Sequence, residues 1–198
     1  SATIDHIESS DPSRVVQSMN HPKGKIDNTI ILIGMMGAGK TTIGKSLAKY
    51  LDKTFIDSDQ EIQKRTGVKV PVIFEIEGEI GFRKREADLL KELIKIDNIV
   101  LATGGGIILS EENRKLLRQK GTIIYLWATV NDLLHRTRHD KNRPLLQTTD
   151  PQVKLTELYD QRDPIYRELA HIVVESGSLS AHQMVKYLSQ ELNDSTLR

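Results

Sequence analysis

A glycine-rich segment followed by a lysine and a threonine is the clearest chemical pattern in the sequence. It reads Gly34-Met-Met-Gly-Ala-Gly39-Lys40-Thr41 and fits G-x-x-x-x-G-K-[ST], with an apolar run before it and a helical pattern after it. Glycines let successive backbone N–H groups turn inward around phosphate oxygens, and the following helix presents its positive end to the same anion. The segment therefore predicts a phosphate-binding loop, or P-loop, formed by Gly37, Ala38, Gly39, Lys40, Thr41 and Thr42.

Two residues give this loop the chemistry of a nucleoside triphosphate site. The Lys40 ammonium can lie between the β- and γ-phosphates, and the Thr41 hydroxyl can coordinate the Mg²⁺ that such nucleotides carry. The sequence has no N/T-K-x-D motif, which reads guanine in GTP-switch proteins. The alternative interpretation of the same residues is a glycine-rich turn before a helix, without a ligand.

A second candidate site follows the second predicted strand, where the sequence reads Phe55-Ile56-Asp57-Ser58-Asp59. A strand that runs beside the P-loop strand would deliver both carboxylates to the same edge of the sheet. We expect Asp57 to hold magnesium-bound water and Asp59 to face a second substrate, where it can accept the proton of a hydroxyl group. The alternative for Asp59 is a structural role at the start of the next helix, through the helix dipole.

Three glycines and a set of arginines are the remaining candidates. Gly104-Gly105-Gly106 follows the third predicted strand, and three glycines are more than a simple turn needs, which favours close contact between backbone and ligand. Arginine side chains bind carboxylates and phosphates through paired hydrogen bonds, although most surface arginines are only solvated charges. The candidates, among which the fold must decide, are Arg83, Arg136, Arg138, Arg143 and Arg162.

The elements that must position these residues alternate between short apolar runs and helical patterns. This alternation is typical of strand–helix–strand units around a parallel sheet. We therefore predict an α/β fold in which a five-stranded parallel sheet is flanked by helices, within one domain over residues 29–198. The predicted strands are residues 29–33, 54–56, 99–102, 122–127 and 172–174. Capping signals predict helix starts near Ser58, Thr129, Asp150 and Ser180.

Three segments do not follow this alternation. Residues 1–28 carry isolated apolar residues among turn formers, so we expect a flexible N-terminal arm. Residues 67–81 and 139–150 match neither a strand nor a helix. Insertions of this kind on a parallel sheet tend to be mobile flaps over the ligand site, and we expect the same here.

The overall composition excludes several other classes of protein. Of 198 residues, 28 are Lys or Arg and 27 are Asp or Glu, so no overall field favours nucleic acid or a membrane surface. The longest uncharged apolar run, residues 30–39, is about half of the roughly 20 residues that a membrane span needs. The absence of cysteine excludes thiol catalysis and Cys-ligated metals, and fits a cytoplasmic location. The six histidines lack metal-ligand spacing and are expected to be surface groups.

Taken together, these motifs resemble the shikimate kinases in order and spacing. The resemblance extends from about residue 29 to residue 192. It implies a three-layer P-loop fold like that of nucleoside monophosphate kinases, and transfer of the γ-phosphate of ATP to the 3-hydroxyl of shikimate, in the chorismate and aromatic amino acid pathway. The residues that carry it are the P-loop through Gly44, Asp57-Ser-Asp59, Gly81-Phe-Arg83 with Glu86, Gly104-Gly-Gly, Arg143-Pro-Leu-Leu and Arg162-Asp-Pro-Ile-Tyr166.

The resemblance also implies roles for individual residues around the acceptor. Asp59 would bind the shikimate hydroxyls and orient or deprotonate the attacking one. Arg83 and Arg162 would bind the ring carboxylate, and Gly105 would contribute a backbone amide. Glu86 would hold Arg83 in position.

On the nucleotide side, the resemblance implies that Lys40 binds the phosphates and that Thr41 and Asp57 hold Mg²⁺. Arg143 would reach the phosphates and neutralise charge on the transferred group, and Arg136 would contact the adenine. ATP is then the co-substrate and Mg²⁺ the cofactor. The implied partners are small molecules alone, and the implied assembly is a monomer.

The resemblance divides the chain further, into an acceptor-binding subdomain at about residues 67–95 and a mobile lid at about residues 138–150. Closure of such a lid would exclude water from the phosphoryl group. One departure concerns the adenine. Many relatives carry a basic residue after the last strand, whereas this chain reads Glu175-Ser-Gly-Ser178.

Two other functions stay open on the sequence. One is a related small-molecule kinase, for gluconate or a nucleoside monophosphate, that shares the P-loop and lid but has another acceptor pocket; Asp59, Arg83 and Arg162 argue against it. The other is a nucleotide-binding module that regulates a partner without catalysis. It would bind MgATP and turn over no acceptor.

Overall fold

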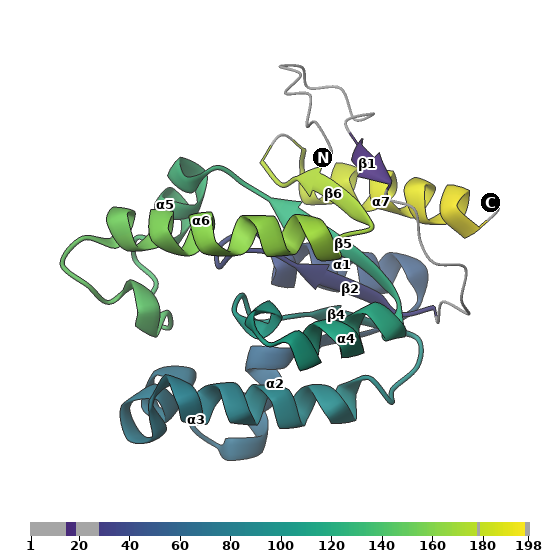
Figure 1. The fold of residues 1–198 in the computed structure, drawn as a ribbon. Coiled ribbons are helices and arrows are strands. Elements are labelled where there is room, and N and C mark those ends of the chain that lie inside the picture. The colour runs from purple at the N-terminus through teal and green to yellow at the C-terminus, as the bar shows by residue number, and fades with distance from the viewer. Residues whose placement is uncertain (1–14, 19–27, 178, 197–198) are drawn as a thin grey trace.

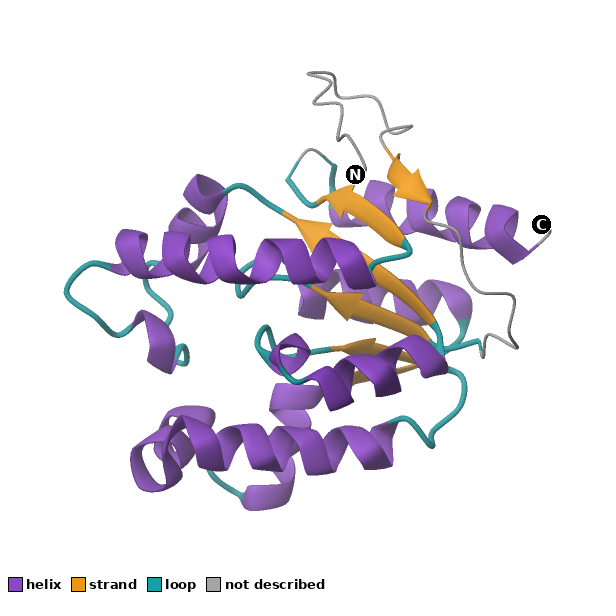
Figure 2. Ribbon diagram, viewed as in Figure 1, coloured by secondary structure: helices purple, strands orange, loops and turns teal. Residues whose placement is uncertain are grey.

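The computed structural model describes residues 15–18, 28–177 and 179–196, so most of the predicted arm at residues 1–28 lies outside the described residues. Strands and helices alternate along the chain (Figures 1 and 2). The strands are β1 (Val15–Ser18), β2 (Ile30–Ile33), β3 (Thr54–Asp57), β4 (Ile99–Ala102), β5 (Thr122–Trp127) and β6 (Ile172–Glu175). The α-helices are α1 (Lys40–Leu51), α2 (Ser58–Thr66), α3 (Val70–Leu93), α4 (Glu111–Lys120), α5 (Val130–Thr137), α6 (Pro151–Leu169) and α7 (Ala181–Thr196), with short 3₁₀ helices at Ile107–Leu109 and Pro144–Leu146.

The five predicted strands all form, and they make one parallel sheet. The strand order is β1-β6-β5-β2-β4-β3, in which β2 to β6 run parallel to their neighbours. The sheet is larger than predicted by one short strand, β1, which pairs antiparallel with β6 at the edge. That strand comes from within the predicted arm, where its lack of a sustained apolar run gave no strand signal.

Helices cover both faces of the sheet. In Figure 1, α4 and α6 lie in front of the strands and α1 and α7 behind them, while α3 lies below, beyond the β3 edge. The central strands β2 and β4 are buried along their whole length, which is why their sequences are apolar without alternation. The result is the predicted three-layer α/β architecture.

The register of the sheet aligns the ends of three strands that carry candidate site residues. Leu32 of β2 pairs with Ala102 of β4, and Ala102 in turn pairs with Asp57 of β3. Because parallel strands all end at the same edge, the P-loop, the β3 carboxylates and the three glycines leave the sheet side by side. The alignment of these three strand ends therefore brings the candidate site residues together.

Helix starts confirm three of the four predicted caps. Thr129 and Asp150 cap α5 and α6 through their side chains, and Ser180 and Gln183 bond reciprocally at the start of α7. The predicted helix start at Ser58 is confirmed, because α2 begins there, but its N-cap is Asp57 and not Ser58. The Ser58 hydroxyl instead accepts a hydrogen bond from the Gly104 N–H at 2.8 Å, and so fastens α2 to the loop after β4.

Residues 67–81 are largely helical, which contradicts the prediction that they match neither a helix nor a strand. They contain the first half of α3, with a kink at Gly78, where φ is 71° and ψ is 179°. The kink shifts the phase of the helical pattern, and two large apolar side chains, Ile76 and Ile80, are 76% and 88% exposed. Apolar residues therefore do not mark the buried face here, and the periodicity that predicts a helix is lost.

The histidine prediction also needs a correction. His135, His139 and His182 are exposed as expected, but the Nδ1 atom of His171 accepts a hydrogen bond from the Ile123 N–H at 2.8 Å. His171 thereby ties the turn before β6 to the start of β5. Among the described residues, there is no cluster of three or more His, Cys, Asp or Glu side chains that could hold a metal, and no helix has the length and apolarity to cross a membrane.

The contact between α1 and β3 yields a test of the fold. A Cβ atom added at Gly44 of α1 would lie 2.5 Å from Cε2 of Phe55, so the helix can approach the strand only because this residue lacks a side chain. We expect Gly44→Ala to lower the free energy of unfolding by about 1–3 kcal/mol through overpacking, despite the gain in helix propensity. Urea denaturation measures the change, with Lys45→Ala on the exposed face of α1 as the control, expected within about 0.5 kcal/mol of the parent. Equal stability of Gly44→Ala and the parent would contradict the close packing.

Candidate active site

The P-loop leaves β2 and runs directly into α1. Gly34, Gly37 and Gly39 have φ values of 149°, 84° and 94°, which only glycine adopts readily, and Gly39 caps the helix. A Cβ atom at Gly34 would also lie 2.6 Å from the Leu126 carbonyl oxygen. Of the six predicted P-loop residues, only Ala38 is buried. Its N–H donates to the Met35 carbonyl.

Lys40 lies at the first position of α1 with its ammonium turned back along the loop. Its Nζ atom donates to the carbonyls of Gly34 and Met35, at 2.6 and 2.9 Å. Removal from water, together with the nearby positive charge of Arg143, lowers the pKa of Lys40 to about 7. This cation would be stabilised by a bound anion.

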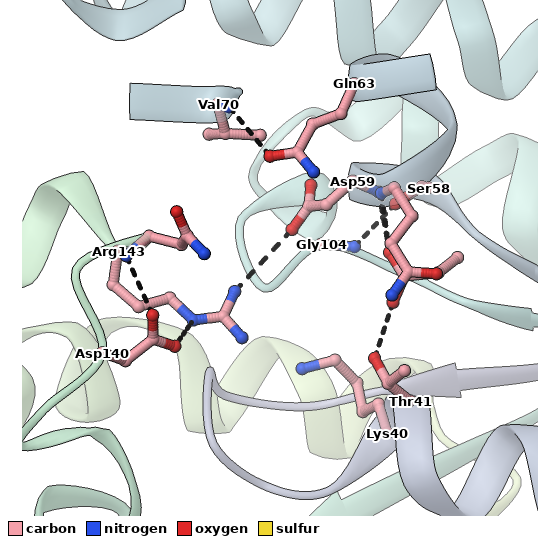
Figure 3. A network of polar contacts seen from close by, with 12 residues as sticks. Lys40, Thr41, Ser58, Asp59, Gln63, Val70, Gly104, Asp140 and Arg143 are labelled. Atoms are coloured by element: carbon pink, nitrogen blue, oxygen red, sulfur yellow. Dashed lines mark hydrogen bonds and ion pairs between the residues drawn. The ribbon is translucent and has the colours of Figure 1, made fainter. Parts of the chain in front are cut away.

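Thr41 and Asp57 form the predicted pair of oxygen donors. The Thr41 hydroxyl donates to Oδ2 of Asp57 at 2.6 Å, while Oδ1 of Asp57 accepts the backbone N–H of Asp59 at 2.9 Å (Figure 3). A hydroxyl beside a carboxylate, next to a phosphate loop, is a donor set of hard oxygen atoms that suits Mg²⁺. The residues present therefore fit that ion.

Asp59 points into the cleft from the first turn of α2. Its Oδ1 atom is buried and has no hydrogen-bond partner within the described chain. Its Oδ2 atom lies 4.0 Å from a terminal nitrogen of Arg143, as the dashed line in Figure 3 marks. Burial, and next the negative charge of Asp57, raises the pKa of Asp59 above its ordinary value, which makes it a stronger base than a solvated carboxylate.

Arg143 reaches this carboxylate from the segment between α5 and α6. Its Nε atom donates to Oδ2 of Asp140 at 3.1 Å, so Asp140 fixes the orientation of the guanidinium (Figure 3). No role was predicted for Asp140 from the sequence. Its position three residues before Arg143 is compatible with this contact, but such a spacing is too common to select one carboxylate.

The three glycines form a floor under the side chains of Asp59, Arg83 and Arg162. An added Cβ atom would lie 2.6 Å from Oδ1 of Asp59 at Gly104, and 2.5 Å from Cζ of Arg83 at Gly106. At Gly105 it would lie 3.2 Å from a terminal nitrogen of Arg162. The glycines are therefore required by the functional side chains that rest on them, in addition to any ligand.

Arg83 lies over this floor and is held by two glutamates of its own helix. Its terminal nitrogens donate to Glu86 at 3.1 Å and to Glu79 at 3.3 Å, which supports the predicted role of Glu86. Glu86 is 1% exposed, and burial raises its pKa to about 7 despite the nearby positive charge of Arg83. A charged carboxylate at this depth is costly in free energy. The charged form of Glu86 is therefore stabilised by the guanidinium of Arg83 beside it.

Arg162 is a buried cation, with 1% of its surface exposed. In the described part of the chain, no carboxylate lies within ion-pair distance of its guanidinium, and its Nε atom has no hydrogen-bond partner. Its guanidinium lies near the Tyr166 hydroxyl, one helical turn later, with Gly105 beside both groups. A buried, unpaired guanidinium is expensive unless an anion compensates it, which points to an anionic ligand.

Arg136 lies on the nucleotide side and joins the P-loop to the end of β6. It donates to the Gly37 carbonyl at 3.0 Å and to the Ser176 carbonyl at 2.9 Å. Ser176 belongs to the segment Glu175-Ser-Gly-Ser178, of which Ser178 lies outside the described residues. The remaining arginine candidate, Arg138, is exposed at the C-terminal end of α5 and lines neither cavity described next.

Two adjoining cavities bring these residues together. One, of about 340 Å³, is lined by Gly37, Gly39, Lys40, Thr41, Thr42 and Arg136 among others. The second, of about 220 Å³, is lined by Arg83, Glu86, Arg162 and the three glycines together with Phe74 and Phe82. Both are also lined by Thr41, Asp57, Asp59, Gly105, Asp140 and Arg143, so the two cavities meet at Asp59 and Arg143.

This cleft has a phosphate loop at one end and two arginines, one buried and one partly buried, at the other, with a carboxylate of raised pKa between them. Such an arrangement on a parallel α/β sheet defines a P-loop kinase that phosphorylates a small anionic acceptor. A family model described as "Shikimate kinase" matches residues 36–193. The chain belongs to the shikimate kinase family, and its relatives identify it as an ATP-dependent kinase.

Individual relatives agree with this assignment. The chain is 62% identical over 167 residues to the shikimate kinase of Nitrosospira multiformis, covering 84% of this chain and 86% of that one. It is 58% identical over 183 residues to the shikimate kinase of Nitrosomonas europaea, covering 92% and 87%. The solved structure of shikimate kinase from Acinetobacter baumannii in complex with shikimate is 46% identical, has a TM-score of 0.84, and covers 88% of this chain and 97% of that one.

The lowered pKa of Lys40 predicts that nucleotide binding takes up a proton. At pH 8 most Lys40 side chains in the empty site are neutral, and a bound polyphosphate favours the charged form. We expect ADP affinity to fall by up to about tenfold per pH unit above pH 7, and proton uptake to approach one at pH 8 and zero at pH 6. Calorimetry in two buffers of different ionisation enthalpy measures the uptake.

Lys40→Arg is the control, because its guanidinium stays charged throughout this range. Proton uptake at pH 8 that is equal in Lys40→Arg and the parent would show that another group titrates.

Proposed function

We propose that the protein transfers the γ-phosphate of ATP to the 3-hydroxyl group of shikimate, giving shikimate 3-phosphate and ADP. Family membership supports this reaction, as does the shikimate bound in the structure of the Acinetobacter baumannii relative. The observation that carries the proposal is the meeting of the two cavities at Asp59 and Arg143. A triphosphate in one cavity and a small carboxylic acid in the other would meet end to end at these side chains.

The larger cavity would hold the nucleotide. Gly37, Gly39 and Thr42 would surround the phosphates together with the Lys40 ammonium, which would leave its two carbonyl partners for phosphate oxygens. Thr41 and Asp57 would hold Mg²⁺, which when bound supplies charge neutralisation at the β- and γ-phosphate oxygens. Arg136 would contact the adenine from the end of α5.

The smaller cavity would hold the acceptor. The Arg83 and Arg162 guanidinium groups would bind the ring carboxylate, each offering the paired donors that a carboxylate requires. Gly105 would present backbone to the ring at a position where any side chain would meet Arg162. Phe74 and Phe82 give the same cavity an apolar wall that suits the carbon face of a ring.

Asp59 and Arg143 would carry out the chemistry at the junction. The 3-oxygen of shikimate forms its bond to the γ-phosphorus as the bond to the β-phosphate oxygen breaks, and Asp59 accepts the hydroxyl proton. Arg143 and Lys40 would stabilise the charge on the transferred group and on the leaving ADP. The raised pKa of Asp59 supports its role as acceptor of that proton.

Two segments would enclose the reaction. We propose that residues 67–95, which include all of α3, form an acceptor-binding subdomain, and that residues 138–150 act as a lid. Arg83 and Phe82 of the first segment and Arg143 of the second line the same cavity, so closure over both substrates would exclude water from the phosphoryl group. Binding of the acceptor would thereby favour transfer over hydrolysis.

This activity would belong to chorismate and aromatic amino acid synthesis in the cytoplasm, a location that the cysteine-free sequence fits. A monomer would suffice, because one chain supplies every residue that lines both cavities. The assay of ADP release with MgATP tests the function, with shikimate, gluconate and nucleoside monophosphates as acceptors. Turnover with shikimate supports the proposal, whereas turnover with another acceptor alone, or with none, overturns it.

We expect Asp59→Asn to lower kcat by about 10²- to 10⁴-fold, because an amide cannot accept the hydroxyl proton. ATP binding should stay within about threefold of the parent, since Lys40 and the P-loop glycines are untouched. Steady-state kinetics and calorimetry measure the two effects. A kcat close to that of the parent would remove Asp59 from the proposed chemistry.

Arg83→Lys tests the carboxylate clamp separately. An ammonium cannot form the two parallel hydrogen bonds of a guanidinium, so we expect the KM for shikimate to rise about tenfold or more. The KM for ATP should change less than twofold, because Arg83 lines only the acceptor cavity of the two. Arg138→Lys, at an exposed position outside both cavities, is the matched control. A shikimate KM unchanged in Arg83→Lys would exclude this residue from the clamp.

A further inference from the structure

Tyr166 is buried below the acceptor cavity, and its hydroxyl joins two parts of the acceptor pocket. It donates to the Gly105 carbonyl at 2.5 Å, across 61 positions in the sequence. The Arg162 guanidinium lies at the same place, since a Cβ atom added at Gly105 would lie 3.2 Å from a terminal nitrogen of Arg162 and 3.5 Å from the Tyr166 hydroxyl oxygen. Burial raises the pKa of Tyr166 to about 12, so the hydroxyl keeps its proton and remains a donor at every physiological pH.

Each of these two contacts fixes a group of the proposed acceptor pocket. Arg162 has no carboxylate partner within ion-pair distance in the described chain, and the Tyr166 hydroxyl lies near its guanidinium, where it can restrict the rotation of that group. The Gly105 carbonyl belongs to a flexible glycine run, and a bond to it sets the plane of the Gly105–Gly106 peptide. Because that peptide is trans, its N–H points in the opposite direction, away from the buried ring.

We propose that Tyr166 is a positioning residue of the acceptor pocket, which holds the Arg162 guanidinium and the glycine floor in one arrangement before the acceptor binds. This inference rests on the proposed function, because it concerns the same carboxylate clamp. Tyr166 acts through Arg162 and Gly105 and does not touch the acceptor. Pre-organisation of a clamp improves binding by reducing the ordering that the ligand must impose.

The neighbouring Tyr125 provides a matched control. Its ring lies 4.8 Å from that of Tyr166, and its buried hydroxyl donates to Asp163 of the same helix, α6, at 2.7 Å. Asp163 is held in turn by Arg167, and neither residue lines either of the two cavities. Removal of either hydroxyl therefore costs one buried hydrogen bond to the same region, but only Tyr166 bonds to the acceptor pocket.

The experiment compares Tyr166→Phe with Tyr125→Phe. For Tyr166→Phe we expect the KM for shikimate to rise about tenfold, which corresponds to the loss of one buried hydrogen bond, with kcat and the KM for ATP within about twofold of the parent. Tyr125→Phe should lose comparable thermal stability with an unchanged shikimate KM. An equal rise of the KM in both variants, or no rise in Tyr166→Phe, overturns the proposal.

A double-mutant cycle with Arg162→Lys tests whether Tyr166 acts through Arg162. If it does, the combined variant raises the shikimate KM by clearly less than the product of the two single effects. Multiplicative effects would contradict that route. Failure of the proposed function is distinguishable from failure of this inference, because it appears as absent shikimate turnover in the parent protein itself.

Discussion

The structure depends on the mutual compensation of charges that share one partly buried cleft. Lys40, Arg83, Arg143 and Arg162 converge there with Asp57, Asp59 and Glu86, close enough to shift the pKa values of several of them. Isolated charges would be costly at such depth, and three of the four cations are held by a neighbour or by backbone, whereas Arg162 has no carboxylate within ion-pair distance among the described residues. Lys40 bonds to P-loop carbonyls, Arg83 to Glu86, and Arg143 to Asp140. These internal contacts stabilise the charges in the empty site. Bound substrates would replace them, so the site can still accept anions.

The sheet register and the glycine floor make this concentration of charge possible. Three strand ends aligned by backbone hydrogen bonds bring together residues that are more than forty positions apart, such as Ser58 and Gly104. Because the three glycines have no side chains, these groups can lie close together. Fold and site are thus determined by the same few residues.

Much of this arrangement could be predicted because its signals are local. Fully buried parallel strands are apolar without interruption, and the P-loop glycines must adopt conformations that other residues avoid, so both leave a pattern in consecutive residues. The kinked α3 could not be predicted in the same way, since exposed isoleucines obscure its periodicity. Asp140 escaped assignment because its spacing to Arg143 is too common to select one carboxylate, and Tyr166 because its contact is with a distant backbone carbonyl that has no sequence signature. Residue type alone does not separate Arg138 from Arg143, whereas the Arg143-Pro-Leu-Leu motif and the fold do.

The contact between Arg143 and Asp59 links the two halves of the reaction. While the guanidinium lies 4.0 Å from Asp59, it lowers the pKa of that carboxyl and partly opposes the effect of burial. A γ-phosphate that draws Arg143 away removes this favourable charge and leaves Asp59 a stronger base, just where the acceptor hydroxyl would lie. The same movement brings positive charge to the group that is to be transferred. One arginine on the proposed lid can therefore couple nucleotide binding to activation of the acceptor. Its charge lies beside either Asp59 or the γ-phosphate, but not beside both at once.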